Sequence, residues 1–137
     1  MPWPVVAAAE RVRYAETDGM GVAYHSNFLI WFEIGRTTYM REVGSAYRDL
    51  EAAGYFMPVL TFQGELRESL RYDDQIEIRT SVTRVRSRQV DFAYEIVKDG
   101  RVVATGSTSH ICLDRDMRPV ALPPALRSTL LPPTVKR

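Results

Sequence analysis

The sequence predicts an α+β domain in which an antiparallel sheet packs against one long helix. Three observations predict it. Apolar and charged residues alternate over residues 10–16, as in a half-buried strand; residues 27–43 have a helical and very apolar pattern; and alternating segments follow residue 55. The chain has 137 residues, of which 45% are hydrophobic, and this suits one domain with a substantial core.

The first half of the chain is expected to form the strand, a turn at residues 17–19 and two helices. For the long helix, roughly 25 Å in length, Ser26 is a possible N-cap and Gly44 suits the position after the C-cap. Apolar side chains cover most of the circumference near its N-terminal half, which predicts a helix enclosed by other structure. A shorter helix is expected over residues 45–53, with Gly54 at its end.

The second half is expected to form four strands and a tail. Gly64 in the first of these strands predicts a bulge or a close approach of another group to the backbone. Asp99 and Gly100 predict a two-residue hairpin turn before the last strand. The proline-rich tail is expected to be extended or mobile from about Ser128. The strands are predicted around Leu60, Phe62 and Leu66, over residues 76–83, over residues 90–97 and over residues 101–113.

Composition argues against several classes of function. The 18 basic and 17 acidic residues nearly balance, so the net charge of +1 predicts no binding to nucleic acid or to an anionic membrane. The single cysteine, Cys112, excludes an internal disulfide and favours a reducing compartment, and two histidines argue against a metal centre. No run approaches the roughly 20 apolar residues of a membrane span, and no signal peptide is evident, so we expect a soluble cytoplasmic protein.

A motif near the start of the long helix is more informative than periodicity alone. It consists of Tyr14, Thr17, Asp18, Gly21, Tyr24, His25, Phe32, Glu33 and Arg36. Together with the run at residues 114–123, this motif resembles the hotdog-fold acyl-CoA thioesterases, specifically the 4-hydroxybenzoyl-CoA thioesterase family and its Tol-Pal-associated branch. The resemblance implies an antiparallel sheet wrapped around one central helix, a single domain over residues 1–137 with its core at about 10–123, and a homo-oligomer, either a dimer or a tetramer. It also implies an acyl-CoA substrate and no cofactor.

A thioester hydrolase needs a donor that polarises the carbonyl and a carboxylate that attacks the carbon or activates water. The resemblance places the catalytic carboxylate at Asp18, and the alternative is that Asp18 only forms an Asx-turn. His25 would orient the thioester, hold a water or tune Asp18, and its alternative role is packing and capping at the helix entrance. The resemblance also implies that the backbone N–H of Tyr24, with the first amides of the helix, meets the thioester carbonyl.

Coenzyme A carries phosphates, so a basic rim is expected. Arg84, Arg86 and Arg88 alternate along an extended segment and would project together to bind these phosphates, although a solvated strand end is the alternative. Glu33 and Arg36 are three residues apart on the helix and are expected to form a structural ion pair. Two other functions stay open: a hydratase or dehydratase of enoyl thioesters on the same fold, and a non-catalytic acyl-CoA-binding protein.

Overall fold

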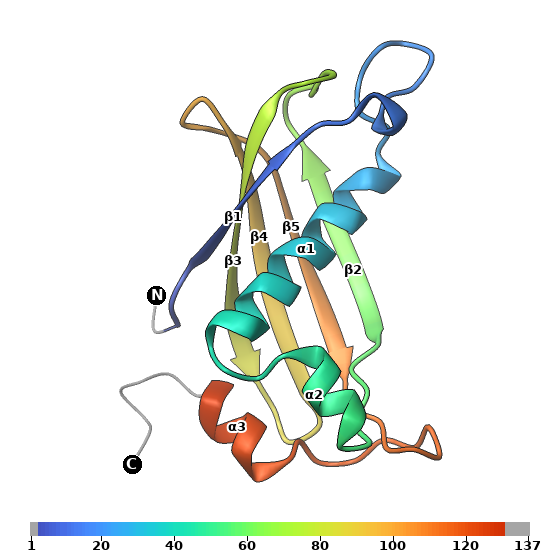
Figure 1. The fold of residues 1–137 in the computed structure, drawn as a ribbon, viewed down its shortest axis with the longest axis vertical. Coiled ribbons are helices and arrows are strands. Elements are labelled where there is room, and N and C mark those ends of the chain that lie inside the picture. Colours follow the sequence, from blue (N-terminus) through green and yellow to red (C-terminus); the bar gives the residue numbers. More distant parts are fainter. Residues whose placement is uncertain (1–2, 131–137) are drawn as a thin grey trace.

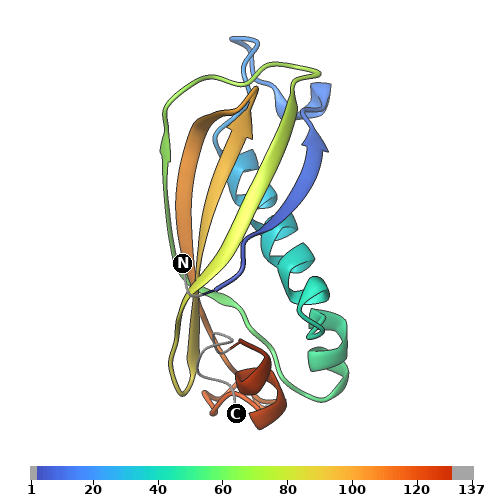
Figure 2. The same ribbon diagram turned by 90° about the vertical axis from the view of Figure 1, so that its left-hand side faces the viewer.

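The computed structural model describes residues 3–130, which form one antiparallel sheet and three α-helices (Figure 1). The strands lie in the order β1-β3-β4-β5-β2 and bend along one side of the long helix α1 (Figures 1 and 2). The predicted α+β arrangement of a sheet around one long helix is therefore confirmed. In chain order the elements are β1 (Val6–Arg11), the 3-10 helix η1 (Tyr14–Glu16), α1 (Ser26–Glu42), α2 (Tyr47–Ala52), β2 (Val59–Leu66), β3 (Gln75–Val85), β4 (Gln89–Lys98), β5 (Arg101–Ile111) and α3 (Pro124–Leu130).

The first strand lies earlier than predicted. β1 covers Val6–Arg11, whereas most of the predicted segment, residues 10–16, leaves the sheet. It turns into η1 because the carboxylate of Glu16 accepts a hydrogen bond of 2.7 Å from the backbone N–H of Arg13. The strand itself contains three consecutive alanines, which are weak strand formers, so its pairing with β3 leaves no alternating pattern in the sequence.

The ends of α1 and α2 follow from local backbone chemistry. Ser26 is the first residue of α1 rather than its N-cap, and the N-cap is His25, whose side chain makes no capping hydrogen bond. At the other end, Gly44 has a φ of 86° and closes the last turn together with Ser45 in a Schellman motif. Gly54, with a φ of 94°, ends α2 in the same way, so both predicted glycine terminators are confirmed.

The last two strands are joined as predicted. Asp99 and Gly100 both have positive φ angles, 51° and 76°, which a type I′ turn requires at its two central positions. The chain on either side pairs in register, with Lys98 opposite Arg101.

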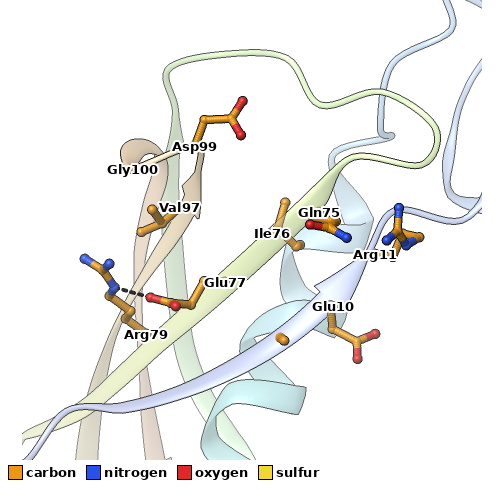
Figure 3. A pocket seen from close by; sticks show the side chains of 10 residues that line it. Glu10, Arg11, Gln75, Ile76, Glu77, Arg79, Val97, Asp99 and Gly100 are labelled. Carbon is orange, nitrogen blue, oxygen red and sulfur yellow. Dashed lines mark hydrogen bonds and ion pairs between the residues drawn. The ribbon is translucent and has the colours of Figure 1, made fainter.

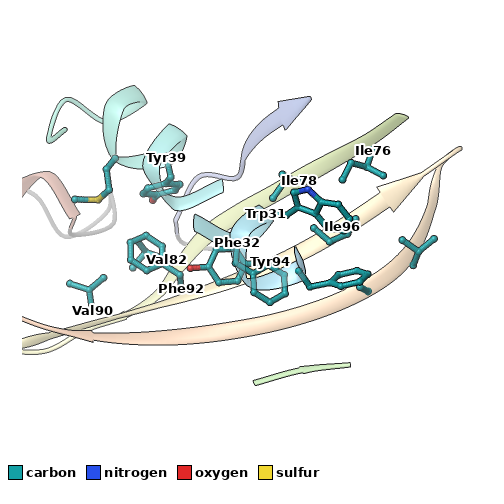
Figure 4. Packing of buried hydrophobic residues seen from close by; sticks show 14 of the residues in the cluster. Trp31, Phe32, Tyr39, Ile76, Ile78, Val82, Val90, Phe92, Tyr94 and Ile96 are labelled. Atoms are coloured by element: carbon teal, nitrogen blue, oxygen red, sulfur yellow. The ribbon is translucent and has the colours of Figure 1, made fainter. Parts of the chain in front are cut away.

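The core lies between the concave side of the sheet and α1 (Figure 4). The ring of Phe32 stacks on Tyr94 with a centroid distance of 4.5 Å. Two glycines make this close packing possible. A β-carbon at Gly35 would lie 2.8 Å from the Cγ2 atom of Ile78, so only glycine lets α1 approach β3 this closely, and Gly106 leaves the space that the Phe32 ring occupies.

Gly64 shows neither of its two predicted roles. It pairs in register with Gly106, and the bulge of β2 lies instead between Val59 and Thr61. A β-carbon at Gly64 would make ordinary contacts, 3.4 Å from the carbonyl oxygen of Thr105 and 3.7 Å from the ring of Phe32, so the predicted close approach lies at its partner Gly106 rather than at Gly64.

One side of α1 is open, so the predicted enclosure of the helix is only half correct. Trp31 is fully buried, whereas Leu29 and Ile30 are exposed. β2, which borders this open side, is an edge strand whose eight residues are all exposed, including Phe62 at 61%. A single sheet covers only one side of a helix, and the apolar residues on the other side remain uncovered in one chain.

The C-terminal segment contradicts the predicted extended tail as far as residue 130. Residues 124–130 form α3, with Pro124 in the first helical position, where the missing N–H costs nothing. Leu126 and Leu130 are buried, and the indole N–H of Trp3 donates to the carbonyl of Leu130. The core therefore extends beyond the predicted boundary at residue 123. The rest of the predicted tail, residues 131–137, lies outside the described residues.

Candidate active site

Asp18 lies in a closed loop between η1 and α1. An isolated antiparallel bridge joins Thr17 to Ala23, and the N–H of Asp18 donates to the carbonyl of Val22 at 2.9 Å. Ala23 is tied in turn to the segment before β3, because its N–H donates to the carbonyl of Leu70 at 2.7 Å. The loop is thus fixed at both ends by backbone hydrogen bonds.

The carboxylate of Asp18 has one occupied and one available oxygen. Its Oδ1 atom accepts hydrogen bonds from the N–H of Met20 at 2.8 Å and of Val22 at 3.4 Å. This is the Asx-turn that the sequence left open as an alternative. Among the described residues, Oδ2 accepts no hydrogen bond, so a structural role for one oxygen leaves the other free for chemistry.

The helix entrance has unpaired amides, but Tyr24 does not supply one of them. The N–H of Tyr24 donates to the carbonyl of Glu16 at 2.8 Å, which corrects the expectation that this amide meets a substrate carbonyl. The next two amides, of His25 and Ser26, meet no acceptor among residues 3–130. They stand at the positive end of the α1 macrodipole and are the donors that the structure offers to an oxyanion.

Asp18 and His25 line the same cavity, of about 280 Å³, between the loop, the start of α1 and the end of β2. The ring of His25 is exposed and lies 4.2 Å from the ring of Tyr24. Phe28 and Leu66 supply apolar walls, and Arg67 adds a positive charge at the rim. The structure thus brings a carboxylate, an imidazole and the helix entrance around one opening.

Two residues that anchor this site were not identified from the sequence. The side-chain amide of Asn27 donates to the carbonyl of Glu16 at 2.8 Å and to the carbonyl of Tyr24 at 3.2 Å. Glu16 is itself buried, and its carboxylate is held by the N–H and the guanidinium of Arg13. The available sequence signal for Glu16 was an acidic residue three positions after the N-cap, which is Arg13. Arg13 lacks the side-chain hydroxyl of the usual capping box, so the pattern was not recognised.

The three predicted phosphate-binding arginines lie at the other end of the sheet. Gln75, the first residue of β3, pairs with Arg11 at the end of β1 that leads toward the Asp18 loop. Nine residues of extended chain separate Gln75 from Arg84, and this corresponds to about 30 Å. A register shift next to Arg84 interrupts the alternation, and Arg86 pairs with a neighbouring carboxylate at 3.8 Å. Arg84, Arg86 and Arg88 are exposed, yet within one chain the structure does not bring them to Asp18.

The largest cavity described, of about 740 Å³, is a charged recess over β1 and β3 (Figure 3). Its two arginines are paired: the guanidinium of Arg79 contacts the carboxylate of Glu77, and Arg11 lies 3.2 Å from the carboxylate of Asp73. The recess lies away from Asp18 and His25, so we do not assign the chemistry to it.

Residues 3–130 contain no cluster of three His, Cys, Asp or Glu side chains that could hold a metal ion. No helix among them is both long and apolar enough to cross a membrane.

Comparisons with known proteins agree with this geometry. The family model of the thioesterase-like superfamily matches residues 12–130. The acyl-CoA thioester hydrolase YbgC of Escherichia coli O157:H7 is 30% identical over 126 residues, which is 90% of each chain. The structure of the DHNA-CoA thioesterase from Staphylococcus aureus matches with a TM-score of 0.84 and 34% identity over 86% of this chain and 80% of that chain. A hypothetical protein from Aquifex aeolicus matches with a TM-score of 0.88 and 26% identity over 91% of this chain and 98% of that chain. The predicted hotdog fold is thereby confirmed.

Proposed function

Because the chain belongs to the thioesterase-like superfamily, we propose that it hydrolyses the thioester of an acyl-coenzyme A to a free acid and coenzyme A. The observation that carries the proposal is that Asp18 and His25 line one cavity at the entrance of α1, where the amides of His25 and Ser26 are unpaired. The names of the relatives from E. coli and S. aureus, both acting on coenzyme A thioesters, support the substrate class. We also propose that the chain belongs to the 4-hydroxybenzoyl-CoA thioesterase family and to its Tol-Pal-associated branch, because it carries the motif at residues 14–36.

In the proposed reaction, the carbonyl oxygen of the thioester accepts hydrogen bonds from the amides of His25 and Ser26. Negative charge grows on this oxygen in the transition state, and loss of one such donor typically lowers the rate by about 10² to 10³. The α1 dipole adds to the stabilisation because both amides lie in its first turn.

In the proposed reaction the Asp18 carboxylate acts in one of two ways, as a nucleophile or as a general base. As a nucleophile, its free oxygen adds to the carbonyl carbon, the carbon–sulfur bond breaks, coenzyme A takes a proton and leaves, and water hydrolyses the mixed anhydride. As a general base, it removes a proton from water, the resulting hydroxide adds to the carbon, and the proton passes to the departing sulfur. In both cases the two backbone donors on Oδ1 hold the carboxylate in place.

His25 is proposed as a positioning residue. Its exposed ring lines the cavity beside Asp18 and can hold the attacking water or orient the thioester. The contact with the Tyr24 ring limits its rotation.

We propose that the working unit is a homo-oligomer, at least a dimer. An unpaired edge strand such as β2 readily pairs with another strand, and its exposed apolar residues continue onto Leu29 and Ile30 of α1. A second copy would cover this face and complete the enclosure of the helix. It would also offer a way for Arg84, Arg86 and Arg88 to reach coenzyme A bound at the Asp18 site of another protomer. A reducing location such as the cytoplasm suits the free, buried Cys112.

The oligomer is tested by light scattering on the variant Phe62→Glu. A charge in the centre of the exposed β2 face should convert the oligomer to a monomer. Val5→Glu places the same charge on another exposed apolar residue and should leave the mass unchanged. A monomeric wild-type protein, or an unchanged mass for Phe62→Glu, would contradict the proposal.

The catalytic proposal is tested by thiol release from short-chain, long-chain and aromatic acyl-CoA esters. Asp18→Asn should lower kcat/KM by about 10² to 10⁴. Asp114→Asn is a matched control, because Asp114 also forms an Asx-turn, accepting from the N–H of Asp116 at 2.8 Å and of Arg118 at 3.1 Å. Its activity should equal that of the wild type.

Equal activity of Asp18→Asn and the wild type would refute the role of Asp18. Addition of water to an enoyl-CoA without thiol release would identify a hydratase instead. Tight acyl-CoA binding with no turnover of any ester would identify a binding protein.

A further inference from the structure

Arg36 is a largely buried cation without a close counter-ion. It lies in the middle of α1, and its side chain is only 12% exposed. The expected ion pair with Glu33 is loose, because the nearest atoms are 4.0 Å apart and the Glu33 side chain is 67% exposed. No other carboxylate within residues 3–130 approaches Arg36 to 4.0 Å or less.

The other polar groups near Arg36 are neutral. Burial raises the pKa of Tyr47 and of Tyr94, although the positive charge of Arg36 opposes both shifts. Burial, assisted by the charge of Arg36, lowers the pKa of His110 to about 4. At neutral pH none of these groups carries a charge, and the Thr108 hydroxyl, which joins Tyr94 at 2.5 Å to His110 at 2.8 Å, carries none either.

A largely buried guanidinium whose nearest carboxylate is exposed and 4.0 Å away keeps much of the cost of its lost hydration, because neither this loose contact nor hydrogen bonds to hydroxyls neutralise it fully. Such a site gains most from an anion. Arg is also the side chain best suited to bind a carboxylate through two parallel hydrogen bonds.

Arg36 borders two cavities that an anionic ligand could enter. One, of about 350 Å³, has apolar walls made by Leu29, Ile30, Leu60 and Phe62, which belong to the face that the proposed second copy would cover, so a ligand there would lie between two protomers. The other, of about 470 Å³, lies on the side of α2 and is lined by Tyr47 and Glu51. Glu33 lines both cavities, with its side chain largely exposed to solvent. Their volumes fall in the usual range for small-molecule sites, in which apolar walls and a few polar groups set the specificity.

The apolar cavity follows the same two elements as the Asp18 cavity. Phe28 and Leu66 line the cavity of Asp18, while the next residues of α1 and Phe62 of β2 line the cavity of Arg36. His25 and Arg36 are eleven residues apart on the helix, which corresponds to about 16 Å. The apolar walls between His25 and Arg36 can pack against a hydrocarbon segment, and Arg36 can bind an anionic group at the end of that segment.

We propose that Arg36 is a specificity-determining residue that binds an anionic oxygen at the end of the acyl group remote from the thioester. The substrate class is then an acyl thioester with an apolar middle and a terminal carboxylate or ionised hydroxyl. This inference rests on the proposed thioester hydrolysis for its choice of ligand. A carboxylate supplied by a second copy of the chain is the competing occupant.

The test compares esters that differ only in their end groups. Octanoyl-CoA is compared with the eight-carbon ester that ends in a carboxylate, and benzoyl-CoA with 4-hydroxybenzoyl-CoA. For at least one pair, the wild type should show a kcat/KM that is about ten- to a hundredfold higher for the ester with the added oxygen. Arg36→Gln should abolish this ratio and Arg36→Lys should keep part of it. Arg48→Gln, which removes an exposed arginine outside both cavities, should leave the ratio unchanged.

A turnover-independent measurement separates this inference from the proposed function. Calorimetric binding of the free eight-carbon dicarboxylate and monocarboxylate should show the same preference for the dicarboxylate, and Arg36→Gln should remove it. Binding preference without hydrolysis of any ester would support the role of Arg36 and refute the thioesterase. Hydrolysis with no preference in either measurement would overturn the inference alone. An Arg36→Gln variant that loses its oligomeric mass and loses activity equally for all esters would assign the counter-ion to a second copy and overturn it too.

Discussion

Gly106 offers a sharp test of how α1 is seated on the sheet. A β-carbon at this position would lie closer than 3.0 Å to two atoms of the Phe32 ring and 2.9 Å from the carbonyl oxygen of Gln63. The ring cannot move away freely, because it stacks on Tyr94 and is buried in the core. Gly106→Ala should therefore force Phe32 out of its position and shift α1.

The magnitude follows from the size of this overlap. Adding a methyl group to a well-packed core typically costs about 1 to 3 kcal/mol of the free energy of unfolding. A chain of this length has an unfolding entropy of about 0.29 kcal/mol per kelvin, so the Tm should fall by roughly 3 to 10 °C. Thiol release should decline as well, because the Asp18 loop leads directly into α1.

Gly64→Ala is the matched control. Gly64 faces Gly106 across the β2–β5 pair, but a β-carbon there would lie 3.4 Å from the nearest atom, the carbonyl oxygen of Thr105, and 3.7 Å from Phe32. The Tm of Gly64→Ala should stay within about 3 °C of the wild type, since the added carbon makes ordinary contacts and alanine restricts the unfolded chain. Calorimetry at matched protein concentration measures both variants. An unchanged Tm for Gly106→Ala, or an equal fall for both, would refute the packing described for Phe32.

Two further predictions concern His110 and Asn27. Burial lowers the pKa of folded His110 to about 4, below the value of about 6.5 in an unfolded chain, so the unfolded state binds more protons between these values. The free energy of unfolding should fall by about 3 kcal/mol as the pH drops from 6.5 to 4. In urea titrations at several pH values, His110→Gln should lose this part of the pH dependence of the free energy of unfolding, whereas His25→Gln, at an exposed position, should keep it. An equal pH dependence in His110→Gln and the wild type would contradict the assignment to His110. Asn27→Ala removes the bonds to Glu16 and Tyr24, and should cost about 0.5 to 1.5 kcal/mol in urea titration. It should also lower kcat/KM, and full activity would show that the Asp18 loop does not need this anchor.

The parts of the fold that could be predicted are those fixed by short-range chemistry. The strands β3 and β4 alternate over most of their length, and the Asp99-Gly100 turn joins β4 to β5 with a backbone that few other residue pairs adopt. The Schellman motifs at Gly44 and Gly54 are local in the same sense. β1 was misplaced because its alanines pair through the backbone with a strand almost seventy residues away, and nothing in their side chains encodes this partner.

The candidate site, too, could be predicted only where a local sequence pattern encodes it. Asp18 and His25 were identified through a motif, and the structure places both at one cavity, but their positions depend on contacts that no local pattern reveals. Glu16 orders this loop through its carboxylate and its carbonyl together, and the same carbonyl occupies the Tyr24 amide that the motif had suggested as a donor. The donors that we propose for the oxyanion therefore lie one residue further along the chain, at His25 and Ser26, because the first amide is used to fold the loop. This ordering also explains how the loop exposes Asp18: backbone hydrogen bonds within the loop and to Leu70, with the Oδ1 atom of Asp18, hold its conformation, so the Oδ2 atom is not needed to hold the loop.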